Sequence, residues 1–261
     1  KFIIGIGGSA TTEGGIGMLS ALGYDFMDEN GDILPPVFAS LEKVVQIENN
    51  RVPEVLKDCH FQIACDVTNP LCGAQGCVYV FGAQKGVKEE EKESMDRAMQ
   101  SYAACLEKFT GKKFSDIPGT GAAGGLGFAF LWGLPNVELK PGIDIVLEAV
   151  GLTNELKDAD VVVTGEGCLD FQTAMGKVPV GVAKTAKNYN CKVIAFAGSV
   201  TEEAKNCNEK GIDAFFSILP GVCSLDEAMD TEIAQKNMRN AAEQVFRLIL
   251  ACGKEKSFLH P

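Results

Sequence analysis

Short apolar runs alternate with helical patterns in the C-terminal half of the chain. The runs at 160–164, 192–197 and 214–219 are each followed by Gly or a turn, and then by apolar residues at helical spacing. Strands that alternate with helices in this way form parallel sheets with right-handed crossover connections. The pattern therefore predicts an α/β fold with a parallel sheet in this half.

The last part of the chain reads as one helix that begins after Ser224. Ser224 and Glu227 have the spacing of a capping box, in which each side chain accepts a backbone N–H that the helix start leaves unpaired. An apolar stripe follows at helical spacing, and Gly253 is a suitable stop. The stripe consists of Ala241, Ala242, Val245, Phe246, Leu248 and Ile249.

The N-terminal half is less regular. Buried strands are predicted at 2–6 and 61–64, and a short helix at 15–22. Asn30 and Gly31 separate two alternating runs, which favours a two-residue hairpin turn.

Two helices complete this half, and a boundary follows them. Apolar residues at helical spacing predict an amphipathic helix over 88–109, with its charged residues facing solvent. A further helix ends at Gly151, and we expect a boundary between two lobes at 151–158.

Composition narrows the function classes. The chain has 261 residues, of which 46% are apolar, enough for a globular core. Its formal net charge of −11 disfavours binding to nucleic acid or to anionic membranes. The apolar run around 126–134 is too short to cross a bilayer, and no leader pattern opens the sequence, so we expect a cytoplasmic protein.

The cysteines indicate reduced thiols. The ten cysteines are scattered singly, with no C-x-x-C spacing, and there are two histidines. Unpaired Cys behaves as a small apolar side chain, so we expect buried free thiols and no Cys/His zinc site.

Glycine is clustered at three places: 5–17, 118–127 and 165–167. Gly permits positive φ and lets backbone N–H groups approach an anion. Three such loops suggest a polyanionic ligand, although Gly in any one of them could simply permit a tight turn or close packing.

The turn after the strand at 160–164 gathers groups suited to phosphoryl transfer. Glu166, Asp170, Gln172, Thr173 and Lys177 fall within it, where open α/β sheets bind ligands. Carboxylates can hold Mg²⁺ or orient a hydroxyl, and an amine can neutralise phosphate. A surface turn with capping Asp and Thr is the alternative. Asp66 follows the strand at 61–64 and could likewise hold Mg²⁺ or orient a hydroxyl. The alternative is that its side chain only forms an Asx turn.

A nicotinamide site is a weaker alternative. Gly5, Gly7 and Ala10 fit G-x-G-x-x-G/A, but the predicted helix after them is short and a hairpin follows it. The P-loop pattern G-x-x-x-x-G-K-[ST] does not occur in the sequence.

The sequence resembles the type I glycerate kinases. The resemblance rests on GIGGSATTEGGIGMLSALG, ACDVTNPLCGAQG, VFGAQKG, PGTGAAGGLGF, KPGIDIVLEAVGL, GEGCLDFQTAMGKVPVGVAK and VIAFAGSV, which follow the family order. The family normally has a further segment in front, which fits a sequence that opens directly in a predicted strand. We expect that an N-terminal segment is absent here.

The resemblance implies two α/β lobes, one a Rossmann-like parallel-sheet lobe and the other an inserted mixed α/β lobe. Residues 1–150 would form the inserted lobe with its Gly-rich loops, and residues 151–261 the C-terminal half of the Rossmann-like lobe. A homo-oligomer is left open.

The resemblance also implies ATP-dependent phosphorylation of D-glycerate with Mg²⁺, favouring the 2-hydroxyl. Asp66, Asp170 and Lys177 would be catalytic, and Glu166 and Asp170 would hold the metal. Ten residues would bind substrate or phosphate: Gly7, Gly8, Ser9, Thr11, Asn69, Gly119, Thr120, Gly121, Gln172 and Thr173.

One departure from the family pattern weakens the resemblance at one position. The family usually has Arg where this chain has Cys168, and a thiol cannot replace the two charge-assisted hydrogen bonds of a guanidinium. Either activity is weakened or Lys177 takes that role. A non-catalytic fragment that binds a nucleotide or an organic acid is the alternative function.

Overall fold

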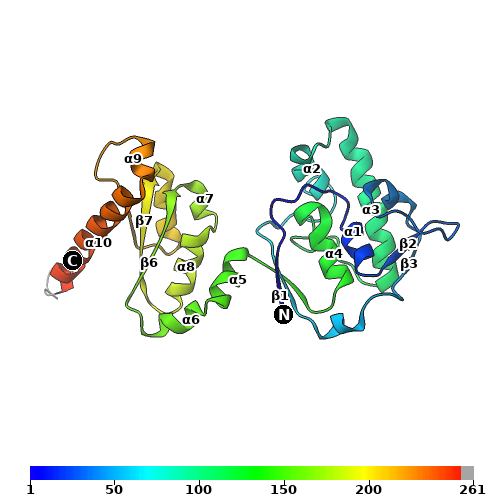
Figure 1. Cartoon of the computed structure of the whole chain (residues 1–261), viewed down its shortest axis with the longest axis horizontal. Helices are drawn as coiled ribbons and strands as arrows, with labels where there is room; N and C mark the ends of the chain where they lie inside the picture. The colour runs from blue at the N-terminus through cyan, green and yellow to red at the C-terminus, as the bar shows by residue number, and fades with distance from the viewer. Residues whose placement is uncertain (254–261) are drawn as a thin grey trace. The chain divides into compact units, whose positions relative to one another are not determined.

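The computed structural model describes residues 1–253. The chain divides into two compact units, Lys1–Ile145 and Val146–Pro261, and each is described by itself (Figure 1). The division falls within helix α5 (Gly142–Ala149). Identifying the first unit with an inserted lobe, and the second with half of a Rossmann-like lobe, stays a prediction.

The first unit contains a parallel three-stranded sheet in the order β1-β4-β5. Its strands are β1 (Phe2–Gly5), β4 (Phe61–Ala64) and β5 (Val137–Lys140). The first two were predicted as buried strands; β4 is buried, but the expected burial of β1 is wrong, because most of its residues are exposed. The sequence did not reveal β5, because a four-residue VELK segment has too few apolar positions to show a pattern.

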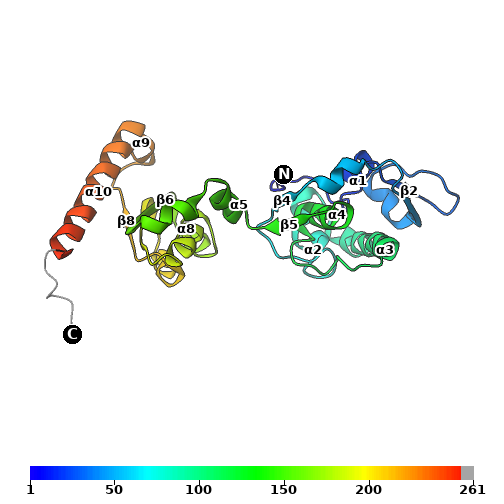
Figure 2. The same ribbon diagram turned by 90° about the horizontal axis from the view of Figure 1, so that it is seen from below.

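Four helices contribute to the main core of the first unit. They are α1 (Ile16–Ala21), α2 (Cys77–Phe81), α3 (Lys92–Thr110) and α4 (Leu126–Gly133). The predicted amphipathic helix is confirmed as α3, and its apolar side packs into a core shared with α1 and α4 (Figure 2).

The hairpin predicted at Asn30–Gly31 forms, because Met27 and Ile33 pair as an antiparallel bridge, but its turn is not the predicted two-residue one: the Asp28 N–H donates to the Asp32 carbonyl oxygen at 3.1 Å, across three residues. Strand β2 (Asp25–Met27) pairs with β3 (Gln46–Glu48), and the chain between them reverses over a longer loop. In that loop Asp28 Oδ1 accepts the N–H groups of Asn30 at 2.9 Å and Asp32 at 3.1 Å. Only Gly31 has positive φ, because these side-chain hydrogen bonds shape the turn in place of a left-handed Asn-Gly pair.

The second unit confirms the predicted parallel sheet. Its strands β6 (Val161–Leu169), β7 (Lys192–Val200) and β8 (Ala214–Ser217) pair in that order. The short helices α6 (Leu152–Glu155) and α7 (Phe171–Ala174) flank β6, and the longer α8 (Val178–Lys187) packs against β6 and β7. The molecule is thus mixed α/β with two parallel three-stranded sheets.

The predicted single C-terminal helix is wrong. The capping box at Ser224 and Glu227 is present, but it opens the short helix α9 (Leu225–Met229), and a second helix, α10 (Thr231–Gly253), follows. Asp230 has extended backbone angles, and its Oδ1 accepts the N–H of Ile233 at 2.9 Å. An Asp in this position caps a new helix start, so it interrupts the pattern.

The apolar stripe of α10 is covered only in part. Val245 is buried against the sheet with Ala241 and Ala242, whereas Leu248 is 59% exposed and Phe246 is 40% exposed. The helix therefore contacts its own unit through its middle part and leaves apolar side chains at its end uncovered.

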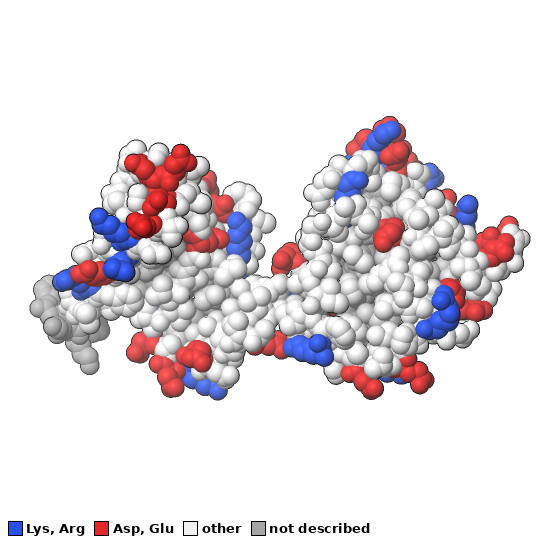
Figure 3. Space-filling view, in the orientation of Figure 1, with Lys and Arg blue, Asp and Glu red and all other residues white. Residues whose placement is uncertain are grey.

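The distribution of charged side chains agrees with the acidic composition, and the cysteines are unpaired as expected. Acidic side chains are spread over the face in Figure 3 and gather over α9, while basic side chains are scattered. All ten cysteines are free, but only four are buried, four are partly buried and two are exposed, so the expected burial of the thiols holds only in part. Burial raises the pKa of Cys77 to about 12. Among the described residues, no helix has the length and apolarity that a bilayer span requires.

Candidate active site

The first glycine loop and Asp66 meet in a cavity of the first unit. Because β1 and β4 are parallel neighbours, the loop after Gly5 and the turn after Ala64 leave the sheet at the same edge. A cavity of about 290 Å³ lies there, lined on its polar side by Gly7, Gly8, Ser9, Asp66 and Lys85.

The first glycines of this loop, at its front beside the cavity, are open, meaning that no atom occupies the space that a side chain would fill. A Cβ added at Gly5, Gly7 or Gly8 would meet no atom within 4 Å, and only Gly8 of these has positive φ, at 70°. Packing and backbone strain therefore do not explain Gly5 or Gly7. Open backbone next to a cavity suits the close approach of a ligand.

The glycines at the back of the same loop have a structural role. A Cβ at Gly14 would lie 2.9 Å from Met99 Sδ, and one at Gly15 would lie 2.3 Å from Ala129 Cβ. Both residues also have positive φ. The back of the loop is thus packed onto α3 and α4, which fixes the open front.

Lys85 is the functional candidate that the sequence analysis missed. Its Nζ donates to Ser9 Oγ and to the Thr11 carbonyl oxygen, both at 2.8 Å. Burial lowers the pKa of Lys85, while Cys77 and Glu13 act in the opposite direction. The signal was present in VFGAQKG, where a lone lysine precedes Gly86, which has a φ of 91°.

Asp66 makes a long-range contact and Asn69 a local one. Asp66 Oδ1 accepts the N–H of Gly142 at 2.8 Å, which holds its carboxylate at the start of α5. Asn69 donates through Nδ2 to the Gln75 carbonyl oxygen at 2.8 Å. An Asx turn at Asp66 is thus not needed to explain its position.

The second glycine cluster, 118–127, is largely a packing element. The Asn69 carbonyl oxygen accepts the N–H groups of Gly119 at 3.2 Å and Gly121 at 3.0 Å. Thr120 is fully buried, and its hydroxyl lies 2.7 Å from the Ile117 carbonyl oxygen. A Cβ at Gly121 would lie 2.2 Å from the Pro70 carbonyl oxygen. Phosphate binding by Gly119, Thr120 and Gly121 stays a prediction, and these contacts favour a supporting role.

The turn predicted directly after the strand at 160–164 is wrong in part, because β6 continues to Leu169, so Glu166 and the glycine cluster 165–167 lie in the strand and not in a loop. The predicted polar groups still come together at the end of this strand. Asp170 precedes α7, and its Oδ1 accepts the N–H of Thr173 at 3.0 Å. The buried hydroxyl of Thr173 donates to Glu166 and accepts the N–H of Asp170 at 3.1 Å. One hydroxyl therefore connects the two carboxylates.

Asp170 is held in its ionised form. The hydrogen bond from the Thr173 N–H lowers the pKa of this carboxyl and outweighs burial, which raises it, while Lys177 adds a smaller lowering effect. Lys177 Nζ lies 3.8 Å from Asp170 Oδ1. Gln172 is exposed beside them, and Cys168 is half-buried on β6.

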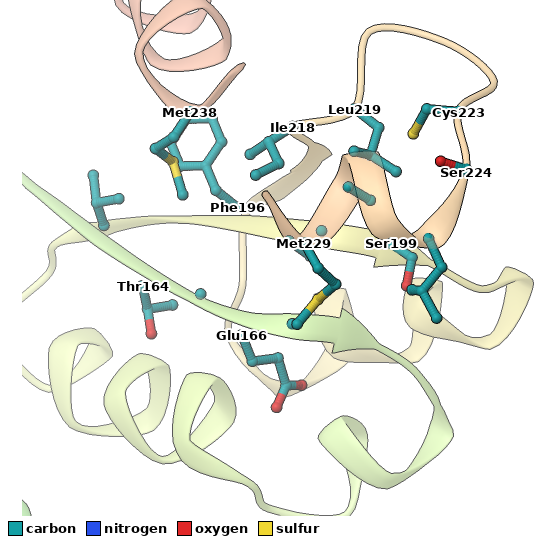
Figure 4. A pocket seen from close by; sticks show the side chains of 17 residues that line it. Thr164, Glu166, Phe196, Ser199, Ile218, Leu219, Cys223, Ser224, Met229 and Met238 are labelled. Carbon is teal, nitrogen blue, oxygen red and sulfur yellow. The ribbon is translucent and has the colours of Figure 1, made fainter. Parts of the chain in front are cut away.

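A second cavity, of about 810 Å³, lies in the second unit against β6, β7 and α9. Figure 4 shows Ile218, Leu219 and Met238 on one side of β6, and Thr164 and Glu166 on the other. No Lys or Arg occurs among the described residues that line it. The apolar walls suit a flat or apolar group and not a phosphate.

The carboxylates of Glu166 and Asp170 could hold magnesium only together with a phosphate ligand. Within residues 1–253, no group of three or more His, Cys, Asp or Glu residues could hold a metal ion. Mg²⁺ often binds one or two carboxylates and completes its shell with water and substrate phosphates. Glu166 and Asp170 fit that kind of site.

The comparisons with known proteins agree with the motifs. The profile of the glycerate kinase family matches residues 1–250. The chain is 42% identical over 247 residues to a glycerate kinase of Bacillus subtilis, covering 94% of this chain and 64% of the relative. It is 45% identical over 228 residues to a glycerate 2-kinase of Escherichia coli, covering 87% and 60%.

A solved structure extends the likeness to the fold. A crystal structure from Salmonella typhimurium LT2, provisionally named glycerate kinase 2, aligns with a TM-score of 0.82 at 42% identity. It covers 97% of this chain and 65% of that chain. The sequence thus spans about two thirds of the length of the relatives that it matches, and nearly all of it aligns. The chain belongs to the glycerate kinase family.

Proposed function

We propose that the chain carries out ATP-dependent phosphorylation of D-glycerate at the 2-hydroxyl, yielding 2-phosphoglycerate. The observation that carries this proposal is the family match over residues 1–250, which includes both polar clusters described above. The name of the Escherichia coli relative, glycerate 2-kinase, favours the 2-hydroxyl. The match also favours a kinase over a nicotinamide-dependent dehydrogenase.

Asp170 is proposed to orient the hydroxyl of glycerate. A carboxylate with a lowered pKa is a good hydrogen-bond acceptor and a weak base. Phosphoryl transfer passes through a loose transition state in which positioning matters most, so an orienting carboxylate is what the reaction needs. Thr173 fixes Asp170 and Glu166 through its hydroxyl, and Lys177 is available to neutralise phosphate.

Glu166 and Asp170 are the residues that would hold Mg²⁺ together with the nucleotide phosphates. When bound, the ion neutralises the charge on the transferring phosphoryl group. Asp66 is the second candidate for orienting the hydroxyl. The open amides of Gly7, Gly8 and Ser9 are proposed to bind carboxylate or phosphate oxygens, because no packing contact occupies the space in front of Gly7 and Gly8.

An assay of the purified chain tests the proposal directly. ADP release is followed with D-glycerate, ATP and Mg²⁺, and added enolase then reports whether the product is its direct substrate, 2-phosphoglycerate. We expect glycerate-dependent ADP release and immediate conversion by enolase. Binding of ATP or glycerate without turnover would instead support the non-catalytic alternative.

Asp170→Asn is the matching variant. We expect it to reduce kcat at least about 100-fold, because a neutral amide cannot hold the hydroxyl as a charged acceptor does. Asp226→Asn is the control, since Asp226 is exposed on α9 and does not line the cavity of the second unit. If Asp170→Asn retained full kcat with an unchanged fold, Asp170 would have no part in the reaction.

A further inference from the structure

Lys85 places a positive charge in the cavity of the first unit with no carboxylate at ion-pair distance among the described residues, and Glu13 acts on this charge only from farther away. Its ammonium donates to two neutral oxygens, Ser9 Oγ and the Thr11 carbonyl, each at 2.8 Å. Among the described residues no carboxylate forms an ion pair with it. An ammonium has three N–H donors, so one donor remains for a ligand.

The backbone around Lys85 is also ready for an anion. Among residues 1–253, no protein acceptor is found for the N–H groups of Gly7, Gly8 and Ser9. The space in front of Gly7 and Gly8 is open. Free N–H groups beside an unpaired ammonium form a setting that binds carboxylate or phosphate oxygens.

Asp66 restricts what that anion can be. Its carboxylate lines the same cavity, and one oxygen accepts the Gly142 N–H. A ligand with a second negative charge would meet repulsion there, whereas a hydroxyl could donate to the carboxylate. The volume of about 290 Å³ lies at the lower end of the range for ligand pockets, which suits a small acid better than a nucleotide.

We propose that Lys85 binds the carboxylate of a small hydroxy acid in this cavity, with Asp66 facing the hydroxyl end of the molecule. The first unit would then select the acceptor acid, with Lys85 as a specificity-determining residue. The identification of that acid as glycerate rests on the proposed function. The argument for a singly charged hydroxy acid rests on the cavity alone.

The test compares a charged ligand with its neutral analogue. Dissociation constants of D-glycerate and of glyceramide are measured by calorimetry on the full chain, as wild type and with Lys85→Met. We expect Lys85→Met to weaken D-glycerate about 10- to 100-fold and to change glyceramide less than about threefold, because only the acid carries the charge that Lys85 binds.

Two further variants distinguish binding of the ligand's charge by Lys85 from structural support of the first glycine loop by Lys85. Lys85→Arg should recover part of the D-glycerate affinity, and Lys43→Met should have no effect, since Lys43 is exposed and does not line the cavity. Equal losses for both ligands with Lys85→Met would show that Lys85 only supports the loop and would overturn the proposal. So would unchanged D-glycerate affinity, or no binding of D-glycerate by the wild type.

The outcomes also separate this inference from the proposed function. Binding of D-glycerate that depends on Lys85, without any turnover, would refute the kinase function and leave the binding site in place. Turnover with an unchanged KM for glycerate in Lys85→Met would keep the kinase function and reject the role of Lys85.

Discussion

At the residue scale, the same residue type serves two purposes in one loop. Gly7 has ordinary φ and free space beside it, so the fold does not require a glycine there and access for a ligand is the reason we propose. Gly15 has positive φ and a neighbour at 2.3 Å, so the fold requires it. Substitution by Ala should therefore disturb binding at Gly7 and folding at Gly15.

The buried hydroxyl of Tyr102 gives a prediction about stability. The Tyr102 side chain is fully buried in the core, and among the described residues its hydroxyl has no hydrogen-bond partner. Tyr102→Phe keeps the ring and removes an unpaired polar atom, so we expect the free energy of unfolding to rise by about 1 kcal/mol. Urea unfolding followed by the fluorescence of Trp132, the single tryptophan, measures the change.

Tyr24→Phe is the matched control for this prediction. The Tyr24 hydroxyl donates to the Gly133 carbonyl oxygen at 2.7 Å, so its removal should lower the free energy of unfolding by about 1 kcal/mol. If both variants were destabilised equally, the Tyr102 hydroxyl would have to be hydrogen-bonded in solution.

At the element scale, the stability of the first site depends on connections between elements. Asp96 on α3 is buried, and its two oxygens accept the Gly73 N–H at 2.9 and 3.1 Å. Gln100 donates to it at 2.7 Å. These bonds tie α3 to the segment between β4 and α2, which also carries Asn69.

Asp96→Ala should therefore destabilise the first unit. The substitution leaves the Gly73 N–H without its acceptor, and losing a hydrogen bond to a charged group costs about 1.5–3 kcal/mol. Asp116→Ala, at an exposed position in the same unit, should stay within about 0.5 kcal/mol. Equal midpoints in urea for Asp96→Ala and the wild type would contradict the role of Asp96.

At the scale of the whole molecule, acidic groups with lowered pKa values occur in both units. For Glu107 the N–H groups of Phe114 and Ser115, both at 2.7 Å, outweigh the effect of burial and lower the pKa. For Asp213, burial raises the pKa, but the ammonium of Lys187 and the N–H of Val193 together lower it more. Each folded unit therefore holds a carboxylate that resists protonation.

This distribution predicts that the chain loses stability in acid. A carboxyl with a lower pKa in the folded state stabilises the fold above its unfolded pKa, and this stabilisation is lost as the pH falls through the folded value. For Glu107 the loss should begin below about pH 4.5, its ordinary value. Urea midpoints at pH 7, 5, 4 and 3 test this, and Glu107→Gln should flatten the decline reported by Trp132. A constant midpoint would be inconsistent with these shifts.

Much of the fold could be predicted because its strands and helices carry local patterns. Strands β6 and β7 contain continuous apolar runs, three of the four residues of β4 are apolar, and α3 repeats with helical spacing, so neighbouring residues suffice to identify them. Strand β5 and the break at Asp230 escaped prediction, because a four-residue strand and a single capping side chain leave almost no periodic signal.

Motif order and periodicity are local properties, so they were enough to identify the family, the parallel α/β architecture and the polar cluster of Glu166, Asp170 and Lys177, although they assigned Glu166 to a turn and not to strand β6. Only the tertiary structure separated open glycines from packed ones and placed Lys85 against Ser9, 76 residues away in the chain. The physical reason is that ligand access and charge pairing depend on which distant segments lie close together, and this is decided by sheet pairing and core packing.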